Sequence, residues 1–269
     1  MLEKGFYLIS TPIGNLSDIT LRALEALENV DILYAEDTRV TLKLLNHYEI
    51  KRKLFAYYEY NEEEVLNEVK RYLDEGLTVG YVSDAGTPGI NDPGYGIVKN
   101  ITGEHKVYSI PGPSAFLTAL TSSGLPVQPF VFIGFLDRKK EAKEKVLKTY
   151  KDLPATLIFY ERKDRIIPLI KDLHKLYGNR KAVVARELTK KFETIYSFNL
   201  GDNFELDLKG EFVLLVEGSK KRIITDEEII ETLKNFLKEG YTNKEAIVKT
   251  SEVLEVAKNK IYQLSLKEK

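Results

Sequence analysis

Two carboxylates and a guanidinium gather at Glu36, Asp37 and Arg39, directly after the apolar segment 30–35. Charged side chains at the end of a buried segment are costly unless they are exposed, paired or bound to a ligand. A helix N-terminal cap closed by a salt bridge would meet this requirement. A catalytic site in which a carboxylate accepts a proton would meet it equally well. Both interpretations stay open, and Glu36, Asp37 and Arg39 are candidate catalytic residues.

A second group of candidate residues lies in the loop 83–94, which reads SDAGTPGINDPG. Three glycines, two prolines and two aspartates in twelve residues are incompatible with a regular helix or strand. Glycine allows a backbone to approach a ligand closely, and the free N–H and C=O groups of such a loop can bind a polar cofactor. We therefore expect Asp84 and Gly86 to border a ligand, with an ordinary surface turn as the alternative.

The segment 110–115, IPGPSA, has the same character. It follows a predicted strand and precedes a predicted helix, so the Ser114 hydroxyl could cap the helix or bind a ligand. It is a second loop of this type, expected at the same edge of one sheet.

Strands and helices that alternate along the chain must position these loops. Short apolar and β-branched segments predict strands at 6–9, 30–35, 78–82 and 106–110. This alternation is typical of a parallel sheet with right-handed crossovers, in which ligands bind beyond the carboxyl ends of the strands. The loops described above would all lie at that edge.

Apolar spacing predicts the helices of this half. The first would be capped by Ser17 or Asp18 and would bury Leu21, Leu24 and Leu27 on one face. The other predicted helices are those at 42–48 and 62–75.

A second α/β unit and a helical tail follow. The predicted strands lie at 131–134, 156–160, 182–186, 194–197 and 211–217, with helices at 140–150 and 165–177, and the portion 193–217 is expected to be antiparallel. In the tail, Thr225 with Glu228 and Thr242 with Glu245 match the capping box, and a last helix is expected through Val253 to Leu264. A helix-turn-helix and a packing or dimerisation module both fit this tail. The predicted domains are 1–121, 122–223 and 224–269.

Composition excludes several classes of protein. The 269 residues include no cysteine and only three histidines, and no apolar run approaches the ~20 residues that span a bilayer. There is no GxxxxGK[ST], GxGxxG or HExxH motif, and with no cysteine ligands we expect no metal site. Because there is no long apolar run and no cysteine, we also expect no membrane partner and a cytoplasmic protein. The net charge of -1 leaves nucleic-acid binding to local basic clusters, such as 138–140 and 162–165.

Four segments together resemble one family of enzymes: TPIGNLSDIT at 11–20, EDTR at 36–39, SDAGTPGINDPG at 83–94 and IPGPSA at 110–115. They resemble the ribosomal RNA small-subunit methyltransferases I, which belong to the tetrapyrrole-methylase-like (class III) methyltransferases. The resemblance continues through GFLDRK at 134–139, FYE at 159–161, ARELTK at 185–190 and KGEFVLLVEG at 209–218, and so covers most of the chain.

The resemblance implies an activity, a cofactor and a fold. The activity is transfer of a methyl group from S-adenosylmethionine to the 2′-hydroxyl of a cytidine in small-subunit (16S) ribosomal RNA, in the assembled 30S subunit. The fold is two α/β domains of the tetrapyrrole-methylase type with the cofactor in the interdomain cleft, plus the helical appendage, in a homodimer. With Asp84 and Gly86, the implied cofactor-binding residues are Pro12, Ile13, Thr87, Ile90, Ser114, Ala115, Glu161 and Leu188.

A ribose hydroxyl is weakly acidic, so a general base would assist such a transfer. The candidates are Asp18, Glu36, Asp37 and Asp84; we favour the pair Glu36 and Asp37, with Arg39 and Arg22 as phosphate-binding or orienting groups. Two other functions stay open: the same fold methylating a tetrapyrrole or a protein, and a non-catalytic RNA-binding protein.

Overall fold

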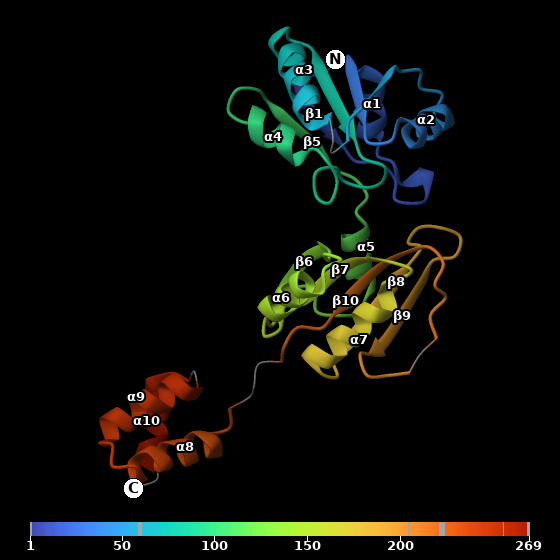
Figure 1. The fold of residues 1–269 in the computed structure, drawn as a ribbon. Helices are drawn as coiled ribbons and strands as arrows, with labels where there is room; N and C mark the ends of the chain where they lie inside the picture. Colours follow the sequence, from blue (N-terminus) through green and yellow to red (C-terminus); the bar gives the residue numbers. More distant parts are fainter. Residues whose placement is uncertain (1, 59–60, 204, 221–223, 255, 268–269) are drawn as a thin grey trace. The chain divides into compact units, whose positions relative to one another are not determined.

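The computed structural model describes residues 2–58, 61–203, 205–220, 224–254 and 256–267. The chain divides into two compact units, Met1–Ser219 and Lys220–Lys269. The first unit contains two five-stranded sheets with their helices, and the second contains helices alone (Figure 1). This architecture confirms the predicted α/β fold with a helical appendage.

The first sheet is entirely parallel, as predicted. Its strands are β1 (Gly5–Ile9), β2 (Ile32–Ala35), β3 (Leu54–Ala56), β4 (Thr78–Val82) and β5 (Val107–Ile110). They lie in the order β3-β2-β4-β1-β5, so β1 is hydrogen-bonded to both β4 and β5. Strand β3 was not predicted, because a three-residue edge strand carries too little apolar pattern to be recognised.

Helices cover both faces of this sheet, which is why its strands are apolar on both sides. They are α1 (Leu21–Asn29), α2 (Thr38–His47), α3 (Glu62–Asp74) and α4 (Tyr95–Ile101). Helices α1 and α2 lie on one face of the sheet, and α3 and α4 lie on the other (Figure 1). Tyr7 and Val82 pack with α1 and α2, whereas Phe6 and Tyr81 pack with α3 and α4. The strand residues alternate between these two cores, so a shift of one residue in register would exchange the faces.

The predicted start of α1 was wrong. Ser17 and Asp18 lie in a separate 3-10 turn, Leu16–Asp18, and the N-cap is Thr20, whose hydroxyl accepts a hydrogen bond from Ala23 N–H at 3.1 Å. Leu27 is buried as predicted, whereas Leu21 is 84% exposed, and Ala23 and Ala26 complete the buried face of α1.

The second sheet is mixed. Its strands are β6 (Phe130–Phe135), β7 (Thr156–Arg162), β8 (Lys181–Arg186), β9 (Thr194–Asn199) and β10 (Glu211–Val216), in the order β6-β7-β10-β8-β9. Only β6 and β7 are parallel within it; the other pairs are antiparallel, which confirms the prediction for 193–217. Helices α6 (Lys140–Tyr150) and α7 (Ile166–Tyr177) pack on one face through Leu147, Leu169 and Leu173.

The other face of the second sheet is covered from the first half of the chain. Helix α5 (Ala115–Ser122), which follows β5, packs against it through Ala119 and Leu120, and Ile13 from the loop after β1 joins the same core. Loops of the first sheet are thereby held against the second sheet. The predicted domains 1–121, 122–223 and 224–269 stay a prediction. All but the last residue of α5 precede the first boundary, yet the helix packs on the second sheet.

The C-terminal unit has its own core, formed by Ile229, Leu233, Ala246, Leu254, Ile261 and Leu264. Its helices are α8 (Asp226–Lys238), α9 (Asn243–Leu254) and α10 (Lys258–Lys267). The single helix predicted through Val253 to Leu264 was wrong. Helix α9 ends at Leu254 and residues 256–257 are not helical. The Ser251 hydroxyl donates to Val256 C=O at 2.8 Å and satisfies that carbonyl outside a helix. Among the described helices, none is both long and apolar enough to cross a membrane.

Thr242→Ala should weaken the C-terminal unit alone. The Thr242 N–H donates to the Glu245 carboxylate at 2.9 Å and Glu245 N–H donates back to Thr242 Oγ1 at 3.4 Å, which closes the predicted capping box. Its loss should cost about 1 kcal/mol. Amide hydrogen exchange in the full-length chain should show faster exchange in α9 and no change in the first sheet. Thr242→Ser, which keeps the hydroxyl, is the control, and equal exchange in both variants would contradict the assignment.

Candidate functional site

Three loops meet at the carboxyl edge of the first sheet because β1 lies between β4 and β5. Thr11 N–H donates to Gly86 C=O at 2.9 Å and Gly86 N–H donates to Thr11 C=O at 3.0 Å. The Ser10 hydroxyl donates to Thr87 Oγ1 at 3.1 Å, and the Thr87 hydroxyl donates to Pro113 C=O at 3.2 Å. Thr87 therefore ties all three loops together, and its hydroxyl is already engaged within the protein.

Gly86 meets a backbone requirement of this junction. Its φ is +81°, and a Cβ there would lie 3.2 Å from Ile13 Cγ2. A side chain would be strained in this conformation and would crowd the loop after β1. The glycine thus keeps the two loops close enough for their paired hydrogen bonds.

The loop after β8, in the second sheet, contacts the loop after β1, in the first sheet. Glu187 and Thr189, on either side of Leu188, have φ values of 50° and 63°, a region that residues other than glycine rarely adopt. Thr189 Oγ1 accepts a hydrogen bond from Asn15 N–H at 3.0 Å, which joins this loop to the one after β1. Strained backbone of this kind is concentrated at binding and catalytic sites.

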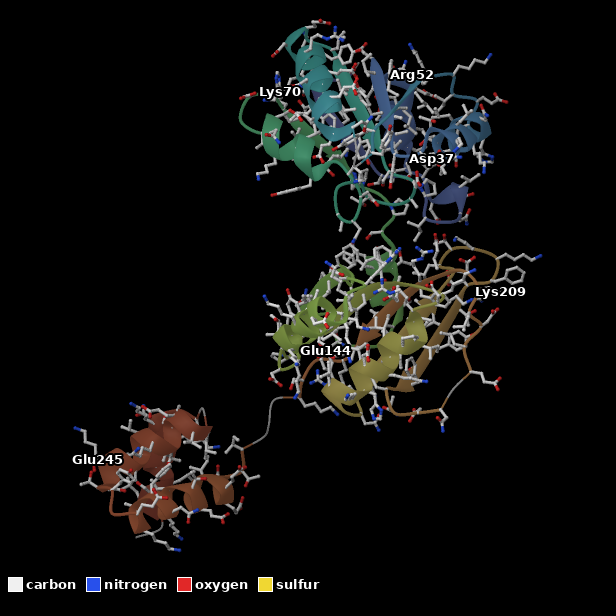
Figure 2. All side chains as sticks on the ribbon, viewed as in Figure 1. Asp37, Arg52, Lys70, Glu144, Lys209 and Glu245 are labelled. Carbon is white, nitrogen blue, oxygen red and sulfur yellow. The ribbon has the colours of Figure 1, made fainter. Side chains whose placement is uncertain are left out.

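The buried Arg186 holds the same loop in place. Its guanidinium donates to the carbonyls of Phe192 and Lys209 and to the Asp207 carboxylate. Lys209 is labelled in Figure 2. One side chain at the end of β8 thus connects the two segments that border the site from the second sheet.

Between these loops lies a cavity of about 780 Å³. Its walls include 84–87, 90–92 and 114–116 on the side of the first sheet, and 160–163 and 210–213 on the side of the second. This volume lies in the range of small-molecule and cofactor sites. The cavity is therefore the candidate functional site.

One wall of the cavity is acidic. Asp84 N–H donates to the Glu36 carboxylate at 3.1 Å, and the Asp84 carboxylate accepts from Asp37 N–H at 3.0 Å. Burial is the main cause that raises the pKa of Glu36, and the nearby Asp84, Asp92 and Asp37 charges raise it further. Burial likewise raises the pKa of Asp84 and of Asp92. Of the neighbours Glu36 and Asp37, it is Glu36 that lines the cavity.

Asp37, labelled in Figure 2, is the N-cap of α2. Its carboxylate accepts from Arg39 N–H at 2.8 Å and from Arg39 Nη2 at 2.6 Å. The hydrogen bond from the Arg39 side chain is the largest cause that lowers the pKa of Asp37 to about 2. The capping interpretation therefore describes Asp37 and Arg39, neither of which lines the cavity.

The N-terminus of α5 offers polar groups to the cavity. Ser114 is its N-cap residue but makes no side-chain capping bond. The Tyr160 hydroxyl instead accepts a hydrogen bond from Phe116 N–H at 3.1 Å, and burial raises the pKa of Tyr160 to about 12. The Ser114 hydroxyl is thus left available to a ligand.

Most residues predicted to bind the cofactor surround this one cavity. Those that line it are Ile13, Asp84, Gly86, Thr87, Ile90, Ser114, Ala115, Glu161 and Leu188. Pro12 does not line it, and their roles in binding stay a prediction. Glu161, although buried, has its charge balanced by Arg165 at 3.3 Å. Asp18 and Arg22, also proposed from the sequence, lie in the 3-10 turn and on exposed α1 positions, outside the lining.

The cavity also contains residues that sequence patterns did not predict. Asn91 and Asp92 line it from the same glycine-rich loop as Asp84, and Phe135 and Tyr160 line it from β6 and β7. Their position depends on the pairing of the second sheet. For Phe135, the available signal was an aromatic residue shortly before the basic run 138–140. Within the described residues, no three histidine, aspartate or glutamate side chains are placed to hold a metal ion.

The comparisons with known proteins agree with this geometry. Residues 5–203 match the sequence model of the tetrapyrrole (corrin/porphyrin) methylases. The chain belongs to the tetrapyrrole methylase family. This methylase is 41% identical to ribosomal RNA small subunit methyltransferase I of Halalkalibacterium halodurans, over 97% of this chain and 95% of that protein. It is 40% identical to the protein of that name from Escherichia coli O157:H7, over 99% and 96% of the two chains.

Solved structures share the fold of this methylase. Diphthine synthase matches with a TM-score of 0.64 at 15% identity, over 79% of this chain and 89% of that one. Uroporphyrin-III C-methyl transferase from Thermus thermophilus, complexed with S-adenyl homocysteine, matches with a TM-score of 0.55 at 19% identity, over 78% and 96%. These likenesses establish the two-sheet fold. The family match and the relatives of about 40% identity show that the chain is a methyltransferase.

Asp37→Asn should remove an acid-sensitive contribution to stability. Because the folded pKa of about 2 lies below the ordinary value of 3.8, this carboxylate stabilises the fold above about pH 4 and ceases to do so as pH falls toward 2. Urea unfolding of parent and variant should therefore differ near neutral pH and converge near pH 2. Arg39→Gln should reduce the same component but not abolish it, because the backbone N–H of residue 39 still donates to the Asp37 carboxylate. A constant difference at every pH would contradict the pairing.

Proposed function

We propose that this methylase transfers a methyl group from S-adenosylmethionine to the 2′-hydroxyl of a cytidine in 16S ribosomal RNA. The observation that carries the proposal is identity of about 40%, over nearly the full length of both chains, to proteins named ribosomal RNA small subunit methyltransferase I. The cavity supports it, because one chamber offers both a cofactor-sized space and the half-buried carboxylate of Glu36. From the resemblance alone, we further propose a homodimer that acts in the cytoplasm on the assembled 30S subunit.

The cavity suits the cofactor in size and in chemistry. A sulfonium cation is compatible with the acidic wall of Glu36, Asp84 and Asp92. Gly86 lines the cavity, and the uncommitted Ser114 hydroxyl can hydrogen-bond a polar ligand group. When bound, S-adenosylmethionine supplies a methyl group that is already activated for transfer. The protein must then chiefly hold the acceptor oxygen in line and receive its proton.

Of the pair Glu36 and Asp37, Glu36 is the better placed to receive that proton. Its pKa is raised above the ordinary glutamate value, whereas Asp37 is a weaker base because its pKa is about 2 and Arg39 already occupies its oxygens. The proposed general base is therefore Glu36 alone rather than the pair. Asp37 and Arg39 act by fixing the start of α2 directly beside it.

Glu36→Gln should lower the single-turnover rate about 10²- to 10⁴-fold, since the amide keeps the shape of the side chain but accepts no proton. Asp37→Asn should lower it far less. Rates should be measured with saturating enzyme and cofactor, and cofactor affinity of both variants determined by calorimetry. Rates within a few-fold of the parent for Glu36→Gln would remove Glu36 from the mechanism.

The substrate is tested by transfer of labelled methyl from S-adenosylmethionine to 30S subunits that lack the modification. A 2′-O-methyl group blocks alkaline cleavage of the adjacent phosphodiester, so alkaline hydrolysis should release a labelled, alkali-resistant dinucleotide containing cytidine. If cofactor binds but no label enters 30S subunits or free 16S RNA, the substrate assignment fails. Label in alkali-sensitive mononucleotides would instead reject the 2′-oxygen as acceptor.

A further inference from the structure

Phe135, the last residue of β6, is 53% exposed although it lines the cavity. A phenylalanine of a folded domain normally buries most of its ring, because the ring removes a large apolar area from water. An exposed ring in a concave site is available to stack on a flat ligand group. Nucleobases are such groups, and base–aromatic stacking is a main source of affinity for single-stranded nucleic acid.

Neighbouring aromatic rings hold Phe135 in place. Its ring lies 5.5 Å from that of Tyr160, which lies 4.9 Å from that of Phe132, which in turn stacks on Phe116 at 4.4 Å. The hydrogen bond from Phe116 N–H to the Tyr160 hydroxyl fixes the middle of this row. Phe135 is thus the open end of a supported row of rings, so stacking on it costs little side-chain ordering.

A hydrogen-bonding group lies beside this ring. The Asn91 side chain packs against Gly134, where an added Cβ would come within 2.8 Å of both Asn91 Nδ2 and Oδ1. Asn91 lines the cavity, and its amide makes no hydrogen bond to the described part of the chain. An amide presents one acceptor and two donors in a plane, which is the complement of a nucleobase edge.

Two cations complete the surroundings. Arg162 and Lys163 follow Tyr160 in the chain, are exposed and line the cavity. The ion pair of Arg162 with Asp164 spans 3.8 Å between two side chains that are each 64% exposed, so it leaves the guanidinium largely free. Lys190, by contrast, is paired with Glu187 and Glu211. Arg162 and Lys163 are the cavity cations free to contact phosphates.

We propose that Phe135, Asn91, Arg162 and Lys163 form a nucleotide subsite that holds the target residue of the RNA. The base stacks on Phe135, its edge reaches the Asn91 amide, and the flanking phosphates lie against Arg162 and Lys163. The target base must then leave its neighbours in the RNA stack, as in other sequence-specific RNA sites. This inference rests on the proposed function and adds the residues that recognise the substrate.

The test distinguishes the stacking surface of the Phe135 ring from its apolar volume. Phe135→Leu keeps apolar volume but removes the stacking surface, whereas Phe135→Tyr keeps the ring. Phe130→Leu is the matched control, because Phe130 lies on the same strand, is 39% exposed and does not line the cavity. Asn91→Leu removes the amide. Each variant is assayed for kcat/KM with unmodified 30S subunits and, separately, for S-adenosylmethionine affinity by calorimetry.

Phe135→Leu should lower kcat/KM for the RNA substrate about 10- to 100-fold, the range expected for one lost stacking contact. Asn91→Leu should also lower it, and Phe135→Tyr and Phe130→Leu should stay near the parent. Cofactor affinity should be unchanged in all four.

Two results would overturn the subsite. Reduced cofactor affinity in Phe135→Leu would mean that the ring holds the cofactor instead, and an unchanged kcat/KM would mean that the ring contacts no base. Both leave the proposed function intact if the parent enzyme methylates 30S subunits. A parent enzyme that methylates no small-subunit RNA would reject the proposed function, and the subsite with it.

Discussion

The paired backbone hydrogen bonds between Thr11 and Gly86 are the constraint on which the site depends. They join the loops after β1 and β4, and Thr87 extends the junction to the loop after β5 through Pro113 C=O. Strand order makes this possible, because β1 lies between β4 and β5 and all three end at the same edge. The loops are therefore held in one conformation before any ligand arrives, which reduces the entropy lost on binding.

The second sheet forms the other wall of the cavity at the carboxyl edge of the first sheet. Helix α5 and Ile13 pack into its apolar face, while Arg186 and the strained residues around Leu188 bring its loops toward the cavity. The two sides then differ in chemistry. The first sheet contributes the carboxylates of Glu36, Asp84 and Asp92. The second contributes aromatic rings, the exposed cations Arg162 and Lys163, and carboxylates that are paired with Arg165 or Lys190, namely Glu161, Glu187 and Glu211. This arrangement suits the cationic methyl donor and the anionic RNA acceptor of the proposed function.

Sequence patterns predicted the elements better than the details of the site. Strand β4 and helix α6 were predicted to the residue, because their apolar patterns end at clear turn signals. The start of α1 was missed because Ser17, Asp18 and Thr20 are all good caps, and local preference does not choose among them.

Contacts between residues far apart in the sequence determine which residues line the cavity. Glu36 and Asp37 are neighbours, and which one lines the cavity is decided by hydrogen bonds to Asp84, 47 and 48 residues further along the chain. Phe135 depends on the irregular pairing of β6 with β7 near Gly134, which no local pattern indicates. The glycine-rich loops, in contrast, were recognisable because their composition allows little else.

The central claim is that one cavity between the two sheets holds the cofactor and leaves a carboxylate and a ring for the acceptor. A crystal structure with S-adenosylhomocysteine tests it most directly. The account predicts the ligand beside Ile13, Thr87 and Leu188, with the Glu36 carboxylate and the Phe135 ring still open to the remaining space. A ligand outside the cavity, or one that covers both Glu36 and Phe135, would contradict it.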